Sequence, residues 1–347
     1  MSVQDQTFSR DNMRIFSHTS DVVRDENIDH VFSHSPSLLI FAGEALVPGA
    51  GGSPMSGRGK HTQTGGHAVV KRVRLGSHDG AKRGSGPFDT HNVAPDDNTR
   101  FAELNWKFYT HGLAVSKHDL RVNSGDAAIA SFVGDQTQSV MLALADFVAD
   151  DIHSTTSPAN GLVALDSLIS ANDTVQGLNG QTYTKYNARG LSSVGTAPAS
   201  VSFASGSFAA QGIADMRTSF NNASEGMIQP DVGITDYATH ERYEGSLQPQ
   251  ERFAAPLGTG DAAFQGLAFR TKAVVADRKC ASGYFYWLRV GGTDGITLEV
   301  LEGADFAFDE WKPSSNQNVM VRPLELTAAL CIGNRQYGCN KMTSITD

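Results

Sequence analysis

Residues 124–153 carry the hydrophobic pattern of a long amphipathic α-helix. Asn123 or Ser124 can cap its first turn, and Pro158 follows its end. At 1.5 Å per residue the segment predicts a rod of roughly 42 Å, which can serve as a spine for other layers. One stripe carries Ile129, Phe132, Val133, Val140, Ala143, Leu144 and Phe147, and the opposite face carries Ser131, Asp135, Gln138, Ser139 and Asp146.

Two stretches before this helix alternate between apolar and polar residues, the pattern typical of β-strands. The first is Val69–Leu75 and the second Phe101–Val115, with the Gly-, Pro- and Asp-rich loop Gly76–Arg100 between them. Together they predict a two-stranded β-arm with an extended tip, which has little core of its own and so needs a neighbouring surface. In the first strand we expect one face to carry Val69, Lys71, Val73 and Leu75, and the opposite face to carry Val70, Arg72 and Arg74. In the second strand we expect one face to carry Leu104, Trp106 and Phe108, and the opposite face to carry Asn105, Lys107 and Tyr109.

The chain after Pro158 has a mixed pattern, so the fold class that we predict is α+β. Residues 171–210 are rich in Gly, Ser, Ala and Thr and show only weak alternation. Shorter elements are expected elsewhere: an apolar element at Leu162–Ile169, helices at Gly212–Asn221 and Thr235–Leu247 with a strand ending at Ile234 between them, strands at Leu267–Ala276, Tyr284–Val290, Ile296–Val300, Val319–Leu326 and Leu330–Ile332, and a closing strand near the C-terminus.

Composition narrows the class of protein further. The 347 residues, 40% of them hydrophobic, suit two domains or one domain with large excursions. The N-terminal residues have no apolar run typical of a secretory signal, and the apolar stretch Leu38–Val47 is too short for a membrane span and contains Glu44. Three cysteines without metal-site spacing, Cys280, Cys331 and Cys339, are expected to be buried reduced thiols.

Charge is distributed unevenly along the chain. The net charge is −9, which argues against binding nucleic acid through a broad basic surface. Residues 55–83 hold seven basic residues and one acid, Asp79, so this segment carries +6 and the remainder −15. The hypothesis is that the basic residues contact acidic surface on another copy of the chain, and the alternative is a solvated loop. The seven are Arg58, Lys60, Lys71, Arg72, Arg74, Lys82 and Arg83.

Motifs that would indicate catalysis or a cofactor are not found. Gly59-Lys60 is followed by His61, where a phosphate-binding loop needs Ser or Thr, and neither a G-x-S-x-G nor an H-E-x-x-H pattern occurs. Trp106, Trp287 and Trp311 are expected to pack in the core or at an interface. We therefore expect no enzyme, cofactor or metal. The weak candidates are Asp29 with His30 and His34 as metal ligands, Asp150, Asp151 and His153 at a solvated helix end, His240 and Glu241 on the surface, and Ser205 and Ser207 in a loop.

Three blocks of sequence resemble one protein family, in the same order along the chain. AELNWKFYTHGLAVSKHDLRVNSGDAAIASFV (102–133) is similar to the return of an extended loop into a spine helix through an N-S-G turn. GITDYATHERYEGSLQPQERF (233–253) resembles that family's helix and L-x-P-Q-x-R-F segment. FAFDEWKPSSNQNVMVRPLELTAALCIGNRQYGCNKMTSI (306–345) resembles its ending, with a W-K-P turn, an N-Q step and an N-R strand. The family is that of tailed-bacteriophage major capsid proteins with the Hong Kong 97-like fold.

The resemblance implies a coat subunit that forms hexamers and pentamers of an icosahedral shell around double-stranded DNA, without sequence-specific DNA binding. It implies location in the virion, assembly in the bacterial cytoplasm, and a scaffolding protein, a portal and decoration proteins as partners. Two alternatives from other classes are another phage assembly component, such as a tube or decoration protein, and a cytosolic hydrolase with an unrecognised site. The implied divisions are an N-terminal arm (1–42), an extended loop (43–116), a peripheral domain with the spine helix (117–160, completed by strands in 306–347) and an axial domain (161–305).

Overall fold

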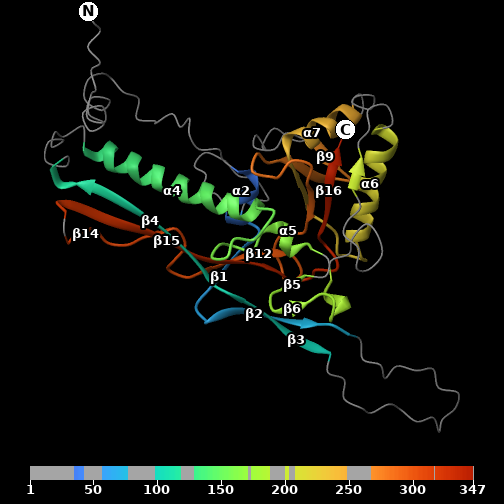
Figure 1. Ribbon diagram of the computed structural model, residues 1–347, viewed down its shortest axis with the longest axis horizontal. Helices are drawn as coiled ribbons and strands as arrows, with labels where there is room; N and C mark the ends of the chain where they lie inside the picture. The colour runs from blue at the N-terminus through green and yellow to red at the C-terminus, as the bar shows by residue number, and fades with distance from the viewer. Residues whose placement is uncertain are drawn as a thin grey trace, which may run out of the picture.

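The computed structural model describes residues 35–42, 57–76, 98–118, 129–170, 173–187, 200–202, 208–247, 267–315 and 317–346. Within these residues the chain is an elongated α+β protein, with a long helix and a long strand pair at one end and a slender β-arm at another (Figure 1). Two six-stranded sheets and two two-stranded ribbons make up its β-structure. The described part of the chain contains no helix with the length and apolar character needed to cross a membrane.

The predicted spine helix is present as α4 (Ile129–His153), and residues 124–128 lie outside the described part. It packs along β4 (Lys107–Ser116) through a buried row that includes Val148 and Ile152. Phe147, expected on the apolar stripe, is instead 58% exposed. The buried stripe is centred on Val148, and consecutive residues of a helix are 100° apart. Phe147 therefore lies at the margin of the stripe, where its ring contacts the Tyr109 ring edge-on with the ring centroids 6.1 Å apart.

The first sheet, called the central sheet, is organised by β15 (Val319–Ile332). This strand pairs antiparallel with β4, β12 (Ile296–Leu301), β13 (Ala307–Phe308) and β14 (Lys312–Pro313). The prediction of two separate strands, ending at Leu326 and beginning at Leu330, was wrong, because partners on several sides keep β15 continuous. An unpredicted strand, β1 (Lys60–Gln63), pairs parallel with β12.

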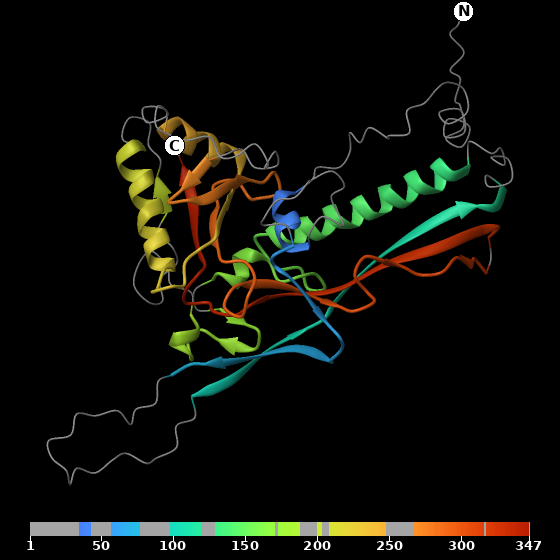
Figure 2. The ribbon, with the colours of Figure 1, turned by 180° about the vertical axis from the view of Figure 1, so that it is seen from behind.

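The second sheet, called the helix-covered sheet, has the strand order β7-β16-β11-β8-β10-β9. The helices α6 (Phe208–Ala223) and α7 (Tyr237–Leu247) pack on one face (Figure 2). Phe285 and Trp287 point to these helices, whereas Tyr286 and Leu288 join the main core, so both faces are buried. Its strands are β7 (Ser200–Ser202), β8 (Val232–Thr235), β9 (Leu267–Phe269), β10 (Lys272–Ala276), β11 (Phe285–Leu288) and β16 (Asn340–Thr346).

The helix-covered sheet confirms most predicted elements of this region and corrects one. The two predicted helices, the strand between them and the closing strand are all present. Leu267–Ala276, expected as one strand, is a hairpin of β9 and β10. The chain reverses at Arg270 and Thr271, which both have positive φ (48° and 67°), a conformation that cannot continue a strand.

The predicted β-arm is confirmed as an antiparallel ribbon of β2 (Ala68–Arg74) and β3 (Thr99–Asn105). The expectation of one continuous strand to Val115 was wrong, because the chain leaves the ribbon at Trp106 and continues as β4 in the central sheet. The Trp106 indole donates a hydrogen bond to the Gly66 carbonyl (2.9 Å). After this break the alternation shifts by one residue, so that Phe108 is 71% exposed and Tyr109 is buried, opposite to the predicted faces.

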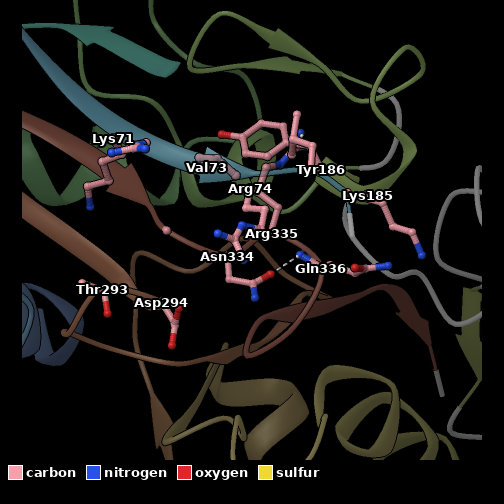
Figure 3. Close-up of a pocket in the computed structure, with 14 residues that line it drawn as sticks. Lys71, Val73, Arg74, Lys185, Tyr186, Thr293, Asp294, Asn334, Arg335 and Gln336 are labelled. Carbon is pink, nitrogen blue, oxygen red and sulfur yellow. Dashed lines mark hydrogen bonds between the residues drawn. The ribbon is translucent and has the colours of Figure 1, made fainter. Parts of the chain in front are cut away.

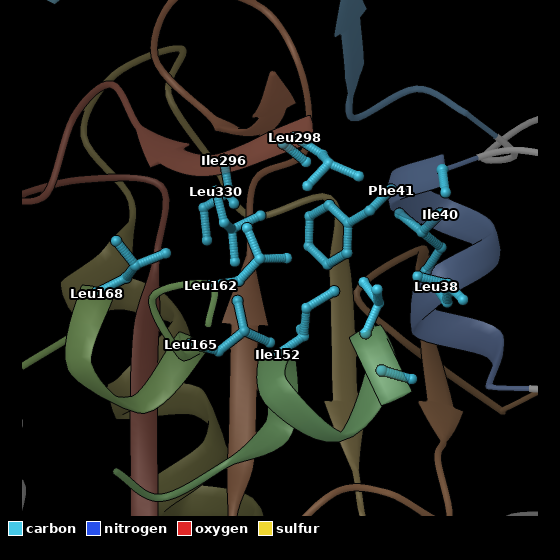
Figure 4. Close-up of a cluster of buried hydrophobic side chains, with 14 of the residues drawn as sticks. Leu38, Ile40, Phe41, Ile152, Leu162, Leu165, Leu168, Ile296, Leu298 and Leu330 are labelled. Carbon is cyan, nitrogen blue, oxygen red and sulfur yellow. The ribbon is translucent and has the colours of Figure 1, made fainter. Parts of the chain in front are cut away.

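The main core lies where α4, the central sheet and the short helix α2 (Pro36–Ala42) meet (Figure 4). Ile40 and Phe41 of α2 are completely buried beside Ile152 and Leu298. A seven-residue helix has little stability of its own, so burial of these side chains holds it. Residues 1–34 of the predicted N-terminal arm lie outside the described residues, but its last seven residues belong to the core of the subunit.

Short elements complete the region between the spine and the helix-covered sheet. They are α5 (Leu165–Leu168), β5 (Thr174–Val175), β6 (Leu178–Asn179) and the 3-10 helix η2 (Thr184–Tyr186). All three cysteines are free and buried, as predicted. Burial raises the pKa of the Cys331 and Cys339 thiols to about 12, which keeps them protonated and unreactive.

Candidate inter-subunit interface

One face of the β-arm is exposed to solvent in the isolated chain. Arg72 and Arg74 project from β2 on this face together with Val70, which is 55% exposed. Arg72 is paired in register with Phe101 of β3, which is 66% exposed. Among the described residues neither arginine has an ion-pair partner. The face therefore combines two exposed cations with apolar side chains, a composition typical of protein interfaces.

The other predicted contact residues differ in how their charges are satisfied. Lys60 forms an ion pair with Asp305, and Lys71 lies 3.2 Å from Glu299. Arg58, half-exposed, approaches Asp231 at 3.6 Å. Lys82 and Arg83 lie outside the described residues. Contact with another subunit stays a prediction for all seven. Arg72 and Arg74 are the two that are exposed and have no acidic partner among the described residues.

Glu299 fixes the base of the arm to the central sheet. Its buried carboxylate accepts hydrogen bonds from Thr297 Oγ1 (2.7 Å) and Gln63 Nε2 (3.0 Å) and faces Lys71. Burial alone would raise the pKa of Glu299, but the hydrogen bonds from Gln63 and Thr297 and the Lys71 ammonium outweigh it and hold this pKa below its usual range. The ionised carboxylate therefore links β1, β2 and β12.

A basic cleft of about 650 Å³ lies between the arm and the body of the subunit (Figure 3). β2 forms one wall, η2 a second, and the turns 293–294 and 333–336 the rest. Five basic residues and one acidic residue, Asp294, line the cleft. The cations are Lys71, Arg72, Arg74, Lys185 and Arg335.

Arg335 builds a wall of this cleft from inside the protein. Its guanidinium is buried and donates to the carbonyls of Leu168 (3.1 Å), Ser170 (2.6 Å) and Tyr186 (3.1 Å). It also stacks over the Tyr186 ring at 5.1 Å. These carbonyls hold residues 168–187 in place but do not neutralise the guanidinium charge. The cations of β2 stand out in the sequence, whereas Lys185 and Arg335 do not, because they come from distant segments.

The end of the spine helix is a buried polar junction, not the solvated terminus that the sequence predicted. Asp151 and His153 are both buried. The Tyr109 hydroxyl donates to Asp151 (2.5 Å), and His153 Nε2 lies 2.6 Å from Ser37 Oγ and 3.4 Å from Asp277 Oδ2. The expectation failed because α2, which covers this end, is far away in the sequence.

Ser37, His153 and Asp277 have the residue types of a hydrolytic triad without its geometry. In a triad the carboxylate orients one ring nitrogen and the hydroxyl meets the other, whereas here both lie against Nε2. No described residue partners Nδ1. The three side chains are also almost completely inaccessible. The group therefore holds α2 against the body and presents no nucleophile to a substrate.

The turn at Asp277 connects the helix-covered sheet to the spine. Besides His153, Asp277 accepts a hydrogen bond from Ser35 Oγ (2.5 Å), and Lys279 lies 2.8 Å from both Asp146 and Asp150 of α4. Burial opposes ionisation of Asp277, but the interaction with His153 and the hydrogen bond from Ser35 hold its pKa well below the usual range.

The remaining weak candidates do not assemble into a site. His240, expected on the surface, is buried, and burial lowers its pKa. Its helix, α7, lies against β10, a contact that the local sequence does not reveal. The described residues contain no group of three potential metal ligands. Asp29, His30, His34, Ser205 and Ser207 lie outside the described residues.

Comparison with known proteins reveals a likeness of structure and not of sequence. No protein-family model matches the chain, and no curated protein matches it. Among solved structures, the cyanophage A-1(L) capsid asymmetric unit matches with a TM-score of 0.63 and 12% identity, over 95% of this chain and 98% of that chain. The capsid of a native GTA particle matches with a TM-score of 0.55 and 11% identity, over 94% and 95%.

A third match comes from Mycobacterium phage Bobi, with a TM-score of 0.54 and 9% identity over 98% of both chains. The three matches extend over nearly the full length of both chains and are not limited to one sheet or helix. The chain therefore has the α+β fold of phage capsid proteins.

Proposed function

We propose that this chain is the major capsid protein of a tailed phage, with a Hong Kong 97-like fold, and that it assembles into hexamers and pentamers of an icosahedral shell around double-stranded DNA. The observation that carries the proposal is the fold match to the cyanophage A-1(L) capsid over 95% of this chain and 98% of that one. The role is structural and non-enzymatic. In this assignment the extended loop is 43–116, the peripheral domain is 117–160 with 306–347, and the axial domain is 161–305.

The shape of the subunit supports a role in a lattice. The β-arm leaves the body as a two-stranded ribbon with exposed Val70 and Phe101, and an isolated ribbon is at best marginally stable in water. Contact with a neighbouring copy would cover this face and add interface area without enlarging the core. In this proposal Arg58, Lys60, Lys71, Arg72 and Arg74 face acidic surface of that neighbour. Arg72 and Arg74 contribute most, because Lys60 and Lys71 already have acidic partners.

The proposed partners and location follow from the same role. The chain would be found in the virion after assembly in the bacterial cytoplasm, with a scaffolding protein, a portal and decoration proteins as partners. A net charge of −9 suits a container whose inner surface does not hold DNA tightly.

The test is assembly of the purified protein, with and without its candidate scaffolding protein, followed by size-exclusion chromatography and negative-stain electron microscopy. Closed shells, or hexamers and pentamers, are the expected result. Open tubes of regular diameter would instead assign the chain to another class of phage assembly protein. A compact monomer under both conditions would overturn the proposal.

The contribution of the arm cations is tested by replacing Arg58, Lys60, Lys71, Arg72 and Arg74 together with Ser. The variant shells are expected to dissociate at lower salt and lower temperature than the wild type, because salt screens charge contacts between subunits. Shells with unchanged salt and heat resistance would show that these residues make no inter-subunit contact.

A further inference from the structure

Among the described residues, the basic cleft between the arm and the body holds more positive charge than negative charge. Of its five cations, Lys71 faces Glu299, and Arg335 is bound by carbonyl groups. Arg72, Arg74 and Lys185 are exposed. The single lining carboxylate, that of Asp294, cannot match them. Within the part of the chain that the structure describes, the cleft therefore has an excess of positive charge that could bind an anionic group from another molecule.

The interior of the protein strengthens this positive field. Arg335 is buried, and its charge is held by neutral carbonyls of Leu168, Ser170 and Tyr186 instead of by a carboxylate. A buried charge is screened less than an exposed one. Asn334 adds a further donor to the rim, because its Oδ1 accepts the Gln336 N–H (3.0 Å), which leaves its Nδ2 for a ligand (Figure 3).

The surroundings of the cations favour a protein carboxylate over a phosphate. Val73 and Leu75 line the cleft, and the exposed Phe101 lies directly opposite Arg72 in the ribbon. Arginine beside aromatic side chains is typical of the centre of a protein–protein interface. A phosphate group has no apolar part to pack on these neighbours, whereas a protein segment that carries a carboxylate does.

The charge of the chain identifies the partner. Residues 55–83 carry +6 and the remainder −15, so other copies of the same chain carry an excess of acidic residues that could complement the cleft. The β-arm, whose strand β2 forms one wall of the cleft, projects to one side of the elongated subunit (Figure 1). Contact between such a patch and a different patch on the next copy is head-to-tail, the arrangement that closes into rings.

We propose that the basic cleft is a carboxylate-binding site for an acidic segment of a second copy of this chain, held by Arg72, Arg74 and Lys185. The inference rests on the proposed shell function. It adds the site at which a segment of the neighbouring subunit binds, and it adds Lys185, which lies outside the arm, to the residues that contact this segment. Because the cleft has one wall on the arm and the others on the body, the bound segment would also fix the arm against the body.

Crosslinking tests the identity of the ligand. Shells are assembled from an equal mixture of unlabelled and nitrogen-15-labelled subunits and treated with a water-soluble carbodiimide. This reagent activates a carboxylate, the Lys185 amine displaces the resulting urea, and an amide bond forms. Peptides that join Lys185 of one isotope to an Asp or Glu of the other are expected. Shells in which every Lys185 link lies within one copy, or in which Lys185 forms none, would overturn the proposal.

Matched variants test the energetic role. Arg72→Ser, Arg74→Ser and Lys185→Ser are combined, and the control combines Arg217→Ser, Arg278→Ser and Lys117→Ser, which removes the same charge from outside the cleft. The cleft variant is expected to dissociate at a salt concentration about twofold lower than the control. Equal dissociation midpoints would overturn the proposal.

Two further outcomes separate the alternatives. Lys185→Arg keeps the charge but cannot be coupled, so it should lose the crosslink and keep the salt resistance. If the cleft variant instead releases nucleic acid while its salt resistance matches that of the control, the cleft binds phosphate and the proposal fails. Failure of the shell function itself is distinct, because the wild-type protein would then form no shells at all.

Discussion

The central sheet and the β-arm use the same kind of β-structure in opposite ways. β12 is buried along almost its whole length, and β15 is buried over its second half. In the arm, residues of β2 and β3 alternate between partly buried and exposed, and Phe101 is 66% exposed. β12 and the second half of β15 are covered within one chain, whereas one face of the arm is exposed, as are β14 and alternate residues of β4 at the outer end of the central sheet. The difference is the one expected if the arm, as proposed, is covered by a neighbouring subunit.

Two aromatic residues of the arm region give the largest contrast. Trp106→Ala removes a ring that is only 8% exposed and should lower the free energy of unfolding of the isolated subunit by about 3–5 kcal/mol. Phe101→Ala should change it by less than about 0.5 kcal/mol, yet weaken assembled shells. Chemical denaturation of unassembled subunits measures the first quantity. Equal losses for both variants would contradict the comparison.

Arg335 gives the next largest effect. Arg335→Met leaves three buried carbonyls without their donor, so the free energy of unfolding should fall by about 3 kcal/mol. Arg217→Met on the exposed side of α6 is the matched control and should stay within about 0.5 kcal/mol of the wild type. Denaturation at neutral pH measures both. A loss no larger than that of the control would mean that residues 168–187 hold their shape without the guanidinium.

Asp277 gives a smaller effect that depends on pH. Its pKa in the folded protein lies below the ordinary value of 3.8, so the ionised carboxylate stabilises the fold above about pH 4, and this contribution is lost as the pH falls through the folded pKa. Asp277→Asn should therefore cost about 2 kcal/mol at pH 7 and less at pH 3. Asp150→Asn, at a side chain that is 53% exposed, is the control. A loss that is equal at pH 7 and pH 3 would contradict this account.

Two lysine ion pairs give the smallest contrast. Lys312 and Asp309 form an exposed pair, whereas Lys341 is buried, lies 2.7 Å from Asp166 Oδ1 and donates to the Asp166 carbonyl (2.9 Å). Lys312→Ala should leave the melting temperature unchanged, because exposed pairs contribute little. Lys341→Ala should lower it measurably. Calorimetry of the unassembled subunit compares the two, and a lower melting temperature for the Lys312 variant alone would reverse the expectation.

The sequence predicted those elements whose pattern is local. The spine helix and the strands of the arm repeat their apolar positions over many residues, so their type could be inferred without knowing their partners. Trp106 is different, since the break there depends on Gly66 and on the separate partners of β3 and β4. β1 has no alternation of its own and exists because β12 lies beside it.

The candidate interface was predictable only in part for the same reason. Arg72 and Arg74 follow each other in one strand, so their shared face is visible in the sequence. Lys185 and Arg335 reach the cleft from η2 and from the turn before β16, and nothing in the local sequence marks either as its neighbour. The junction of Ser37, His153 and Asp277 likewise joins residues separated by 116 or more positions.

The pairing of β4 with β15 has a mechanical consequence. The two strands are matched over ten consecutive residue pairs, from Lys107 opposite Ala328 to Ser116 opposite Val319. Ladder hydrogen bonds lie perpendicular to the strands, so tension that slides one strand along the other strains the whole ladder at once instead of opening it one bond at a time. A subunit stretched along these strands would therefore have to break the ten-residue ladder as a unit, which makes this strand pair a strong point of the molecule under tension in that direction.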